Sequence, residues 1–243
     1  GDIDLFVGTR SVPGIYGINP DSFLLENAGN GSFKNVTEAK AFDLMKTGMI
    51  TDASWSDMTG DGIKDLVVVG DWMAPAVFEN SGKRLRLLKS NLNELTGLWN
   101  ALSVADLDGD GDLDLVLGNK GTNWYLKTSK EKPAKLFVND FDNNGTIEQI
   151  FSRNFKDKDV PLALRRELAG QIPSLKKEIL KFEDYAKKSV QELFAEKIIE
   201  NSQIKIAHTF ESGIAYNNGD KTFTFKPMPA RIQYSCVNSI LTM

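Results

Sequence analysis

The chain has 243 residues, of which 41% are hydrophobic and 26% charged, and its formal net charge is −4. This composition is ordinary for a globular protein with a sizeable core. No apolar run approaches the ~20 residues of a membrane helix, so no membrane insertion is expected. The mild negative charge argues against nucleic acid as a partner.

In chain order, the sequence predicts units of short strands separated by turns. Residues 1–50 hold strands near 5–9, 23–27 and 32–37, and residues 51–96 hold four, at 51–56, 66–71, 76–80 and 84–89. Residues 97–134 hold strands at 101–105, 115–118 and 124–127, and the fourth strand there is missing or reduced. We expect each unit to be one small antiparallel sheet.

Residues 135–231 form a fourth unit with strands near 135–139, 148–154, 204–209, 213–217 and 222–226. Within it, residues 161–201 lose the period-two alternation and take helical spacing. Pro173 separates a first helix at 162–171 from a second, and Ser189 with Glu192 makes a capping box that starts a third. The mixed charges of this α-helical insertion predict a solvated face. Residues 232–243 resemble the start of a further unit.

The most informative stretch is Asp106-Leu-Asp-Gly-Asp-Gly-Asp-Leu-Asp114. Five carboxylates in nine residues repel one another unless a hard cation lies among them. The spacing predicts side-chain ligands at loop positions 1, 3, 5 and 9, which are Asp106, Asp108, Asp110 and Asp114, with the backbone carbonyl of Asp112 at position 7. An EF-hand is excluded because position 12 is Leu117 and the flanks are strand-like.

The loop recurs along the chain. Asp57 to Asp65 and Asp140 to Glu148 follow the same spacing, and the first eight residues match the end of a fourth copy. Repeats of several strands each are the signature of a propeller or solenoid array. About three and a half units are visible, fewer than the ~4 to 8 blades of a closed propeller. We therefore expect the intact protein to supply more blades, and its signal peptide, beyond this sequence.

The repeated Asp-x-Asp-x-Asp-Gly-x-x-Asp-Leu-Val pattern resembles the FG-GAP/VCBS repeat superfamily, whose calcium-binding blades also occur in integrin α-subunits. The Gly97-Leu-Trp-Asn100 segment, the run from Glu131 to Ile150 and the helical insertion look like bacterial VCBS-repeat proteins associated with ASPIC/UnbV domains. The resemblance implies a mainly β fold: one partial β-propeller over 1–243, with blades near 1–50, 51–96, 97–134 and 135–231 and the insertion at 161–201.

The resemblance also implies Ca²⁺ ligands in all three loops. By their place in the motif, the implied ligands are Asp57, Thr59, Asp61, Ile63, Asp65, Asp106, Asp108, Asp110, Asp112, Asp114, Asp140, Asp142, Asn144, Thr146 and Glu148. Ile63, Asp112 and Thr146 would use their carbonyls. Four side-chain acids in the middle loop against three in each of the others predict that the middle loop binds calcium most tightly.

Other candidate residues point to packing rather than chemistry. No catalytic residue is assigned, because His208 is the single histidine and lies in a strand-like run. Cys236, the single cysteine, is expected to be buried among apolar residues. Trp55, Trp99 and Trp124 are expected to pack between blades, whereas Trp72 is the best candidate for an exposed ligand contact.

These features favour a calcium-stabilised binding or scaffold module of a secreted, periplasmic or cell-surface bacterial protein. Its ligand would be a protein or a glycan, and the sequence leaves the oligomeric state open. The alternative is a carbohydrate-active enzyme, a polysaccharide lyase or hydrolase, with its site in a propeller cleft. A deep pocket holding two acids that are not calcium ligands would distinguish the enzyme.

Overall fold

The computed structural model describes residues 3–243, apart from the side chain of Glu178, and the fold is mainly β, as the sequence predicts. The chain divides into two compact units. The first unit consists of residues up to Arg10, Asn19–Tyr125 and Phe210–Met243. The second consists of Ser11–Ile18 and Leu126–Thr209. Gly1 and Asp2, which belong to the predicted partial copy of the loop, lie outside the described residues.

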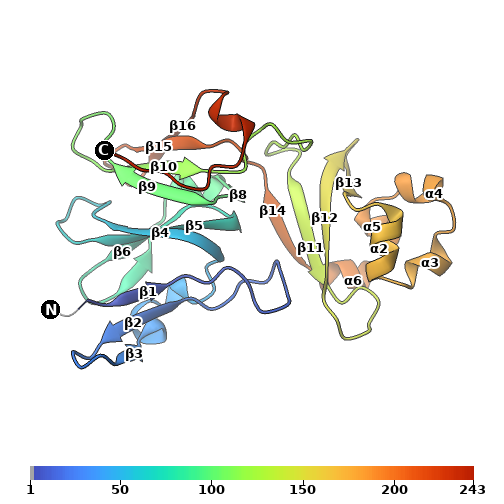
Figure 1. Cartoon of the computed structure of the whole chain (residues 1–243), viewed down its shortest axis with the longest axis horizontal. Helices are drawn as coiled ribbons and strands as arrows, with labels where there is room; N and C mark the ends of the chain where they lie inside the picture. The colour runs from blue at the N-terminus through green and yellow to red at the C-terminus, as the bar shows by residue number, and fades with distance from the viewer. Residues whose placement is uncertain (1–2) are drawn as a thin grey trace. The chain divides into compact units, whose positions relative to one another are not determined.

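The first unit contains three antiparallel sheets of propeller-blade type (Figure 1). Blade 1 has the order β1 (Leu5–Val7), β2 (Phe23–Asn27), β3 (Phe33–Asn35). Blade 2 has the order β4 (Met49–Ser56), β5 (Asp65–Met73), β6 (Ala76–Asn80), β7 (Leu85–Leu87), and β8 (Gly97–Leu98) also pairs with β5. Blade 3 has the order β9 (Ala101–Ala105), β10 (Asp114–Gly118), β15 (Gly213–Asn217), β16 (Phe223–Pro227). Three short helices lie between these strands, α1 (Thr37–Lys40), η1 (Phe42–Leu44) and η2 (Asn91–Glu94), and η3 (Ile232–Tyr234) follows the last strand.

The core of the first unit lies between its blades. Leu66 and Val68 of β5 pack in one cluster with residues of blade 1, and Val67 and Val69 pack in another with residues of blade 3. Successive side chains of a strand point to opposite faces, so both faces of β5 are buried. This explains why β5 is a continuous apolar run rather than an alternating one.

The second unit is one sheet covered by helices. The sheet has the order β13 (Lys158–Pro161), β12 (Glu148–Phe155), β11 (Ala134–Asn139), β14 (Gln203–Ala207). Between β13 and β14 lie α2 (Arg165–Gln171), α3 (Leu175–Glu178), α4 (Phe182–Ala186), α5 (Val190–Leu193) and α6 (Glu196–Glu200). Apolar helix residues pack with Phe137 and Ile150 of the sheet. No helix among residues 3–243 is long and apolar enough to cross a membrane.

The connection between β10 and β15 differs from the sequence prediction. Residues 213–217 pair with β10 and residues 223–227 pair with 213–217, so both strands complete the sheet of the third unit rather than that of the fourth. The second compact unit therefore enters the chain between two neighbouring strands of blade 3. This pairing supplies the strands that the sequence pattern left missing, because pairing partners can lie far apart in sequence.

Several local predictions were wrong. Residues 124–127 form no strand, and residues 232–240 form the short helix η3 followed by chain without regular structure. The predicted second and third helices are broken into four short ones. Strand β13 follows a hairpin turn at Lys156-Asp157, in which the two residues have φ of 50° and 60°. It was missed because such turns are usually recognised by a glycine or asparagine, and this one has neither.

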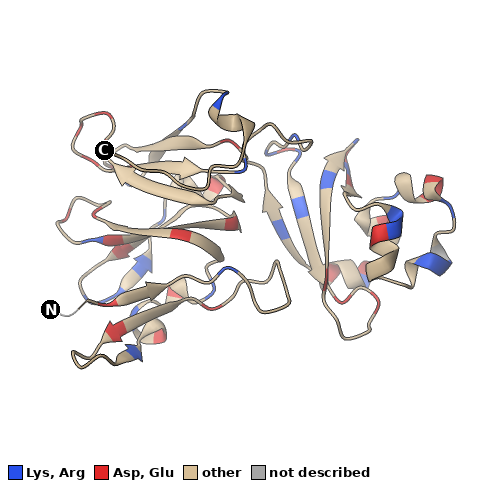
Figure 2. Ribbon diagram, in the orientation of Figure 1, with Lys and Arg blue, Asp and Glu red and all other residues tan. Residues whose placement is uncertain are grey.

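The predicted capping box at Ser189 is confirmed. The Ser189 hydroxyl accepts the Glu192 N–H at 3.2 Å, and Glu192 Oε2 accepts the Ser189 N–H at 2.7 Å. The helices carry both signs of charge along their surface (Figure 2). One ion pair joins them to the sheet, since Lys158 Nζ lies 2.6 Å from Glu192 Oε1.

The contribution of Glu192 to the stability of the fold depends on pH. The hydrogen bond from Lys158 and then the Ser189 N–H lower the pKa of Glu192 from 4.5 to about 2. A carboxyl group with a lowered folded-state pKa stabilises the fold above its unfolded pKa, and this contribution is lost as pH falls through the folded pKa. We expect Glu192→Gln to lower the urea midpoint at pH 7, and the difference from wild type to vanish between about pH 4.5 and pH 2. In Glu200→Gln, an exposed control at the end of α6, no such pH-dependent difference is expected. A Glu192→Gln deficit that is the same at pH 7 and pH 2 would contradict the assignment.

Candidate metal sites

Each predicted calcium loop joins two neighbouring antiparallel strands and wraps around its first acid. In the 106–114 loop, which joins β9 to β10, the Asp106 carboxylate accepts the N–H groups of Gly109 at 2.7 Å and Gly111 at 3.1 Å. Gly111 has a φ of +98°, which a residue with a Cβ rarely adopts. The glycine at position 6 is therefore needed for the backbone to turn back toward position 1.

The other two loops repeat this geometry. Asp57 accepts the N–H groups of Gly60 and Gly62, both at 2.8 Å, in the loop from β4 to β5. In the loop from β11 to β12, Asp140 accepts the N–H groups of Asn144 at 3.0 Å and Gly145 at 2.8 Å. The motif therefore specifies one local structure in both units.

The acid at position 9 is buried in all three loops. Asp65 and Asp114 are 0% exposed and Glu148 is 6% exposed. Each accepts the backbone N–H of position 2, from Met58 at 3.0 Å, Leu107 at 2.9 Å and Phe141 at 3.0 Å, respectively. Because a buried carboxylate is costly unless it is paired or hydrogen-bonded, this contact fixes the end of the loop against its start.

Three asparagines that the sequence reasoning missed hold the position-9 acids from the neighbouring strand. The backbone N–H of Asn27 donates to Asp4 at 2.8 Å, that of Asn80 to Asp65 at 2.8 Å, and that of Asn217 to Asp114 at 2.9 Å. Each asparagine side chain also accepts the N–H of a glycine two residues later. The available signal was the Asn-x-Gly tripeptide at the end of β2, β6 and β15.

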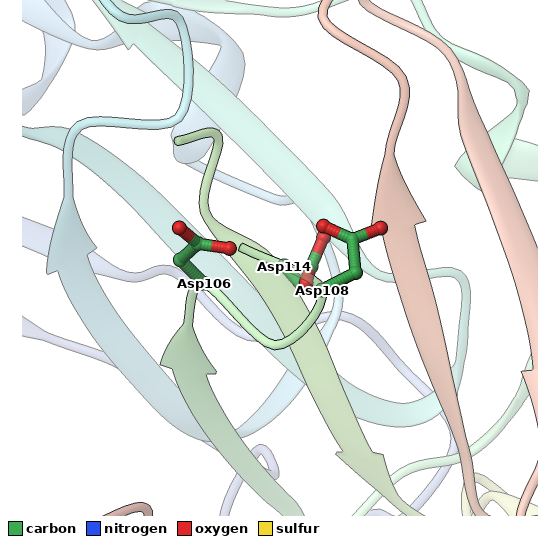
Figure 3. A group of neighbouring side chains, drawn as sticks. All are labelled: Asp106, Asp108 and Asp114. Carbon is green, nitrogen blue, oxygen red and sulfur yellow. The ribbon is translucent and has the colours of Figure 1, made fainter. Parts of the chain in front are cut away.

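Two of the loops bring three acids together. Asp106, Asp108 and Asp114 each offer a carboxylate oxygen, and these oxygens lie within 4.8 Å of one another (Figure 3). The same holds for Asp140, Asp142 and Glu148. Among residues 3–243, the 57–65 loop forms no such group, since Thr59 occupies the position of the second acid.

In each loop the side chain at position 5 accepts a hydrogen bond from the backbone N–H at position 7. The side chains of Asp61, Asp110 and Asn144 accept the N–H groups of Ile63 at 2.8 Å, Asp112 at 2.9 Å and Thr146 at 2.7 Å. These contacts shape the turn. Asp110 is not part of the three-acid group, and coordination by it or by the position-7 carbonyls stays a prediction.

Both three-acid groups fit a cation. In the 140–148 loop, Asp142 Oδ1 is buried and has no hydrogen-bond partner among the described residues. In the 106–114 loop, lost hydration and then the charges of Asp110, Asp114 and Asp106 raise the pKa of Asp108. Converging carboxylates with an unfilled oxygen are the donor set that hard divalent cations such as Ca²⁺ take.

The structure confirms the prediction for Trp99 and contradicts those for Trp72 and Cys236. Trp99 is 0% exposed and packs in the core between blades 2 and 3, as predicted. Trp72 is only 5% exposed, so its predicted role as an exposed ligand contact is wrong; β5 extends through it to Met73 and lies inside its sheet. Cys236 is half-buried rather than buried, and its Sγ lies 2.9 Å from Asn100 Nδ2.

The comparison with protein families agrees with the loop geometry. Residues 57–117 match the family described as FG-GAP-like repeat. The matched segment begins at the first acid of the 57–65 loop and contains the whole 106–114 loop. No curated protein matches the chain. The match covers residues 57–117, which hold two of the three predicted loops, and shows a resemblance of that segment to such a repeat.

Mutation of Asn217 tests how much the asparagine contacts with the loops contribute to stability. Its side-chain amide donates to the carbonyls of Met58 at 3.0 Å and Leu113 at 3.4 Å, and the residue is 5% exposed. Removing the amide leaves buried carbonyls without a donor, so Asn217→Ala should lower the free energy of unfolding by about 1–3 kcal/mol. The neighbouring exposed substitution Asn218→Ala is the control and should cost less. Equal urea denaturation midpoints for the two variants would show that the contact contributes nothing.

Proposed function

We propose that the chain is part of a calcium-stabilised β-propeller that serves as a binding or scaffold module. The observation that carries the proposal is the pair of three-acid groups, at 106–114 and 140–148, each held at the junction of two strands by the same hydrogen bonds. A bound Ca²⁺ would neutralise the converging carboxylates and cross-link the two strands. The family match over 57–117 supports the repeat class.

The proposed ligands in these two loops are the side chains that converge. Asp106, Asp108 and Asp114 would hold one ion, and Asp140, Asp142 and Glu148 the other. The 57–65 loop, in which Thr59 replaces an acid, would bind more weakly through Asp57, Asp61 and Asp65. The role proposed for these residues is to bind the ion and hold the loop.

We further propose an extracellular, periplasmic or cell-surface location and a protein or glycan partner. Weak calcium loops fill where calcium is abundant, as it is outside cells. FG-GAP-like repeats are typical of extracellular domains, and residues 57–117 match that class.

The Asp142→Asn variant distinguishes a loop that binds calcium from an acidic turn that binds no metal. In chelator, Asp142→Asn removes one of three negative charges that lie within 4.8 Å of one another, so the melting temperature should rise. In excess Ca²⁺ the same variant should show a smaller calcium-induced rise than wild type, because it loses a charged ligand. Thermal unfolding with Ca²⁺, Mg²⁺ or chelator measures both effects.

The matched control for this test is Asp157→Asn, which removes an acid from the exposed turn between β12 and β13. The control should keep the full calcium-induced rise. If wild type shows neither a calcium-specific rise in melting temperature nor bound calcium by direct ion analysis, the metal proposal is wrong.

The middle loop should bind calcium most tightly. Beside its three converging acids it carries Asp110 at loop position 5, where the 140–148 loop has Asn144, and affinity rises with the negative charge around the ion. Asp106→Ala should therefore abolish the tightest event in a calcium titration followed by calorimetry, whereas Asp57→Ala should leave that event in place. A tightest event that survives Asp106→Ala would refute this order.

A further inference from the structure

A polar hollow lies beside the 57–65 loop, within the first unit. It has a volume of about 630 Å³ and is lined by Asp61 of the loop and by the end of β6, the β6–β7 turn and the start of β7. A volume of this size accommodates a small ligand. Three of its lining residues are the cations Lys83, Arg84 and Arg86.

The three cations are available to a ligand. All three are exposed, and none of their side chains makes a hydrogen bond or an ion pair within the described part of the chain. By contrast, Glu79 at the same hollow has a partner, since Lys221 Nζ lies 3.2 Å from its Oε1. The three cations therefore outnumber the two acids, Asp61 and Glu79, that line the hollow.

The hairpin that carries the cations is tied to the loop. Ser81 donates its N–H to the Arg84 carbonyl at 3.1 Å, and Gly82 donates to the Asn80 side chain at 2.9 Å. Asn80 in turn donates its backbone N–H to Asp65, at the end of the 57–65 loop, at 2.8 Å. The cations thus project from a hairpin whose backbone is held by these hydrogen bonds, which lowers the cost of ordering them around a ligand.

The chemistry of the lining selects the class of ligand. Guanidinium groups bind carboxylate, sulfate or phosphate oxygens by paired hydrogen bonds. The carboxylates of Asp61 and Glu79, in the same hollow, accept hydrogen bonds from hydroxyl groups. No lining residue is apolar, so the hollow offers no pocket for the hydrophobic anchor that protein partners use. The two acids also interrupt the positive surface that a nucleic acid would need.

We propose that this hollow binds an acidic sugar, with Arg84 and Arg86 on its carboxylate or sulfate group and Asp61 and Glu79 on its hydroxyls. The inference rests on the proposed binding function and names one ligand class for it. Asp61 is also a candidate calcium ligand, so a calcium ion in the 57–65 loop and a sugar in the hollow would lie next to each other.

The test measures binding of defined oligosaccharides to the full chain by calorimetry. The probes are an oligogalacturonate, a sulfated dextran oligomer, neutral dextran of matched length, and inorganic sulfate alone. We expect at least one acidic oligosaccharide to bind, more weakly at higher salt, and neutral dextran not to bind. Arg84→Gln combined with Arg86→Gln should weaken binding by about tenfold or more. Arg231→Gln, an exposed arginine of the same unit, is the control and should keep binding within about twofold.

The outcomes separate this inference from the proposed function. Three results would overturn the acidic-sugar site. The double variant could bind as tightly as wild type, or Arg231→Gln could weaken binding as much as the double variant does. The third is that inorganic sulfate is the only probe that binds. The absence of binding to every acidic probe would overturn the site as well. In each case a calcium-specific rise in melting temperature, measured on the same protein, would leave the calcium-stabilised module intact. A normal calcium response of the double variant would show that it folds.

Discussion

The buried carboxylate at the ninth loop position is the constraint on which the blades depend. Asp65 and Asp114 each start the second strand of a sheet and are fully buried. A carboxylate in that environment needs donors from several directions. Oδ2 takes the N–H of loop position 2, and Oδ1 takes the N–H of an asparagine on the next strand. One side chain therefore fixes the loop, its own strand and the neighbouring strand together.

This constraint explains how blade 3 accommodates a whole second unit. The chain leaves blade 3 after β10 and returns at β15, and the contact between Asp114 and Asn217 spans 103 positions of sequence. The register of the two strands, Leu115 opposite Ala215, is continuous across the insertion. Because loop-closure entropy grows only slowly with length, and because the second unit buries its own core around Phe137 and Ile150, a long insertion is compatible with the sheet.

What could be predicted from the sequence was mostly local. The spacing of acids and glycines determines the three loops, because every hydrogen bond of Asp106 lies within five residues, and the mainly β class follows from the strand pattern. Strand partners could not be read in this way: β15 pairs with β10 and not with the nearer β14, since pairing depends on packing between distant residues. The burial of Trp72 and the Lys156-Asp157 turn were missed for the same reason. Both follow from neighbours across the sheet rather than from local residue preference.

The three loops share one backbone but differ in how far protein donors already satisfy their acids. In the 57–65 loop, Asp65 Oδ2 accepts the N–H groups of Met58 and Thr59 and also the Thr59 hydroxyl, at 3.2 Å. The residue that replaces an acid thus becomes a donor to the buried carboxylate. In the 140–148 loop, by contrast, Asp142 brings a third negative charge and a buried oxygen that receives no donor from the described residues. A divalent cation stabilises only the charge that the protein leaves uncompensated. We therefore expect the 57–65 loop, in which Thr59 donates to the position-9 carboxylate, to depend less on a bound cation than the 140–148 loop.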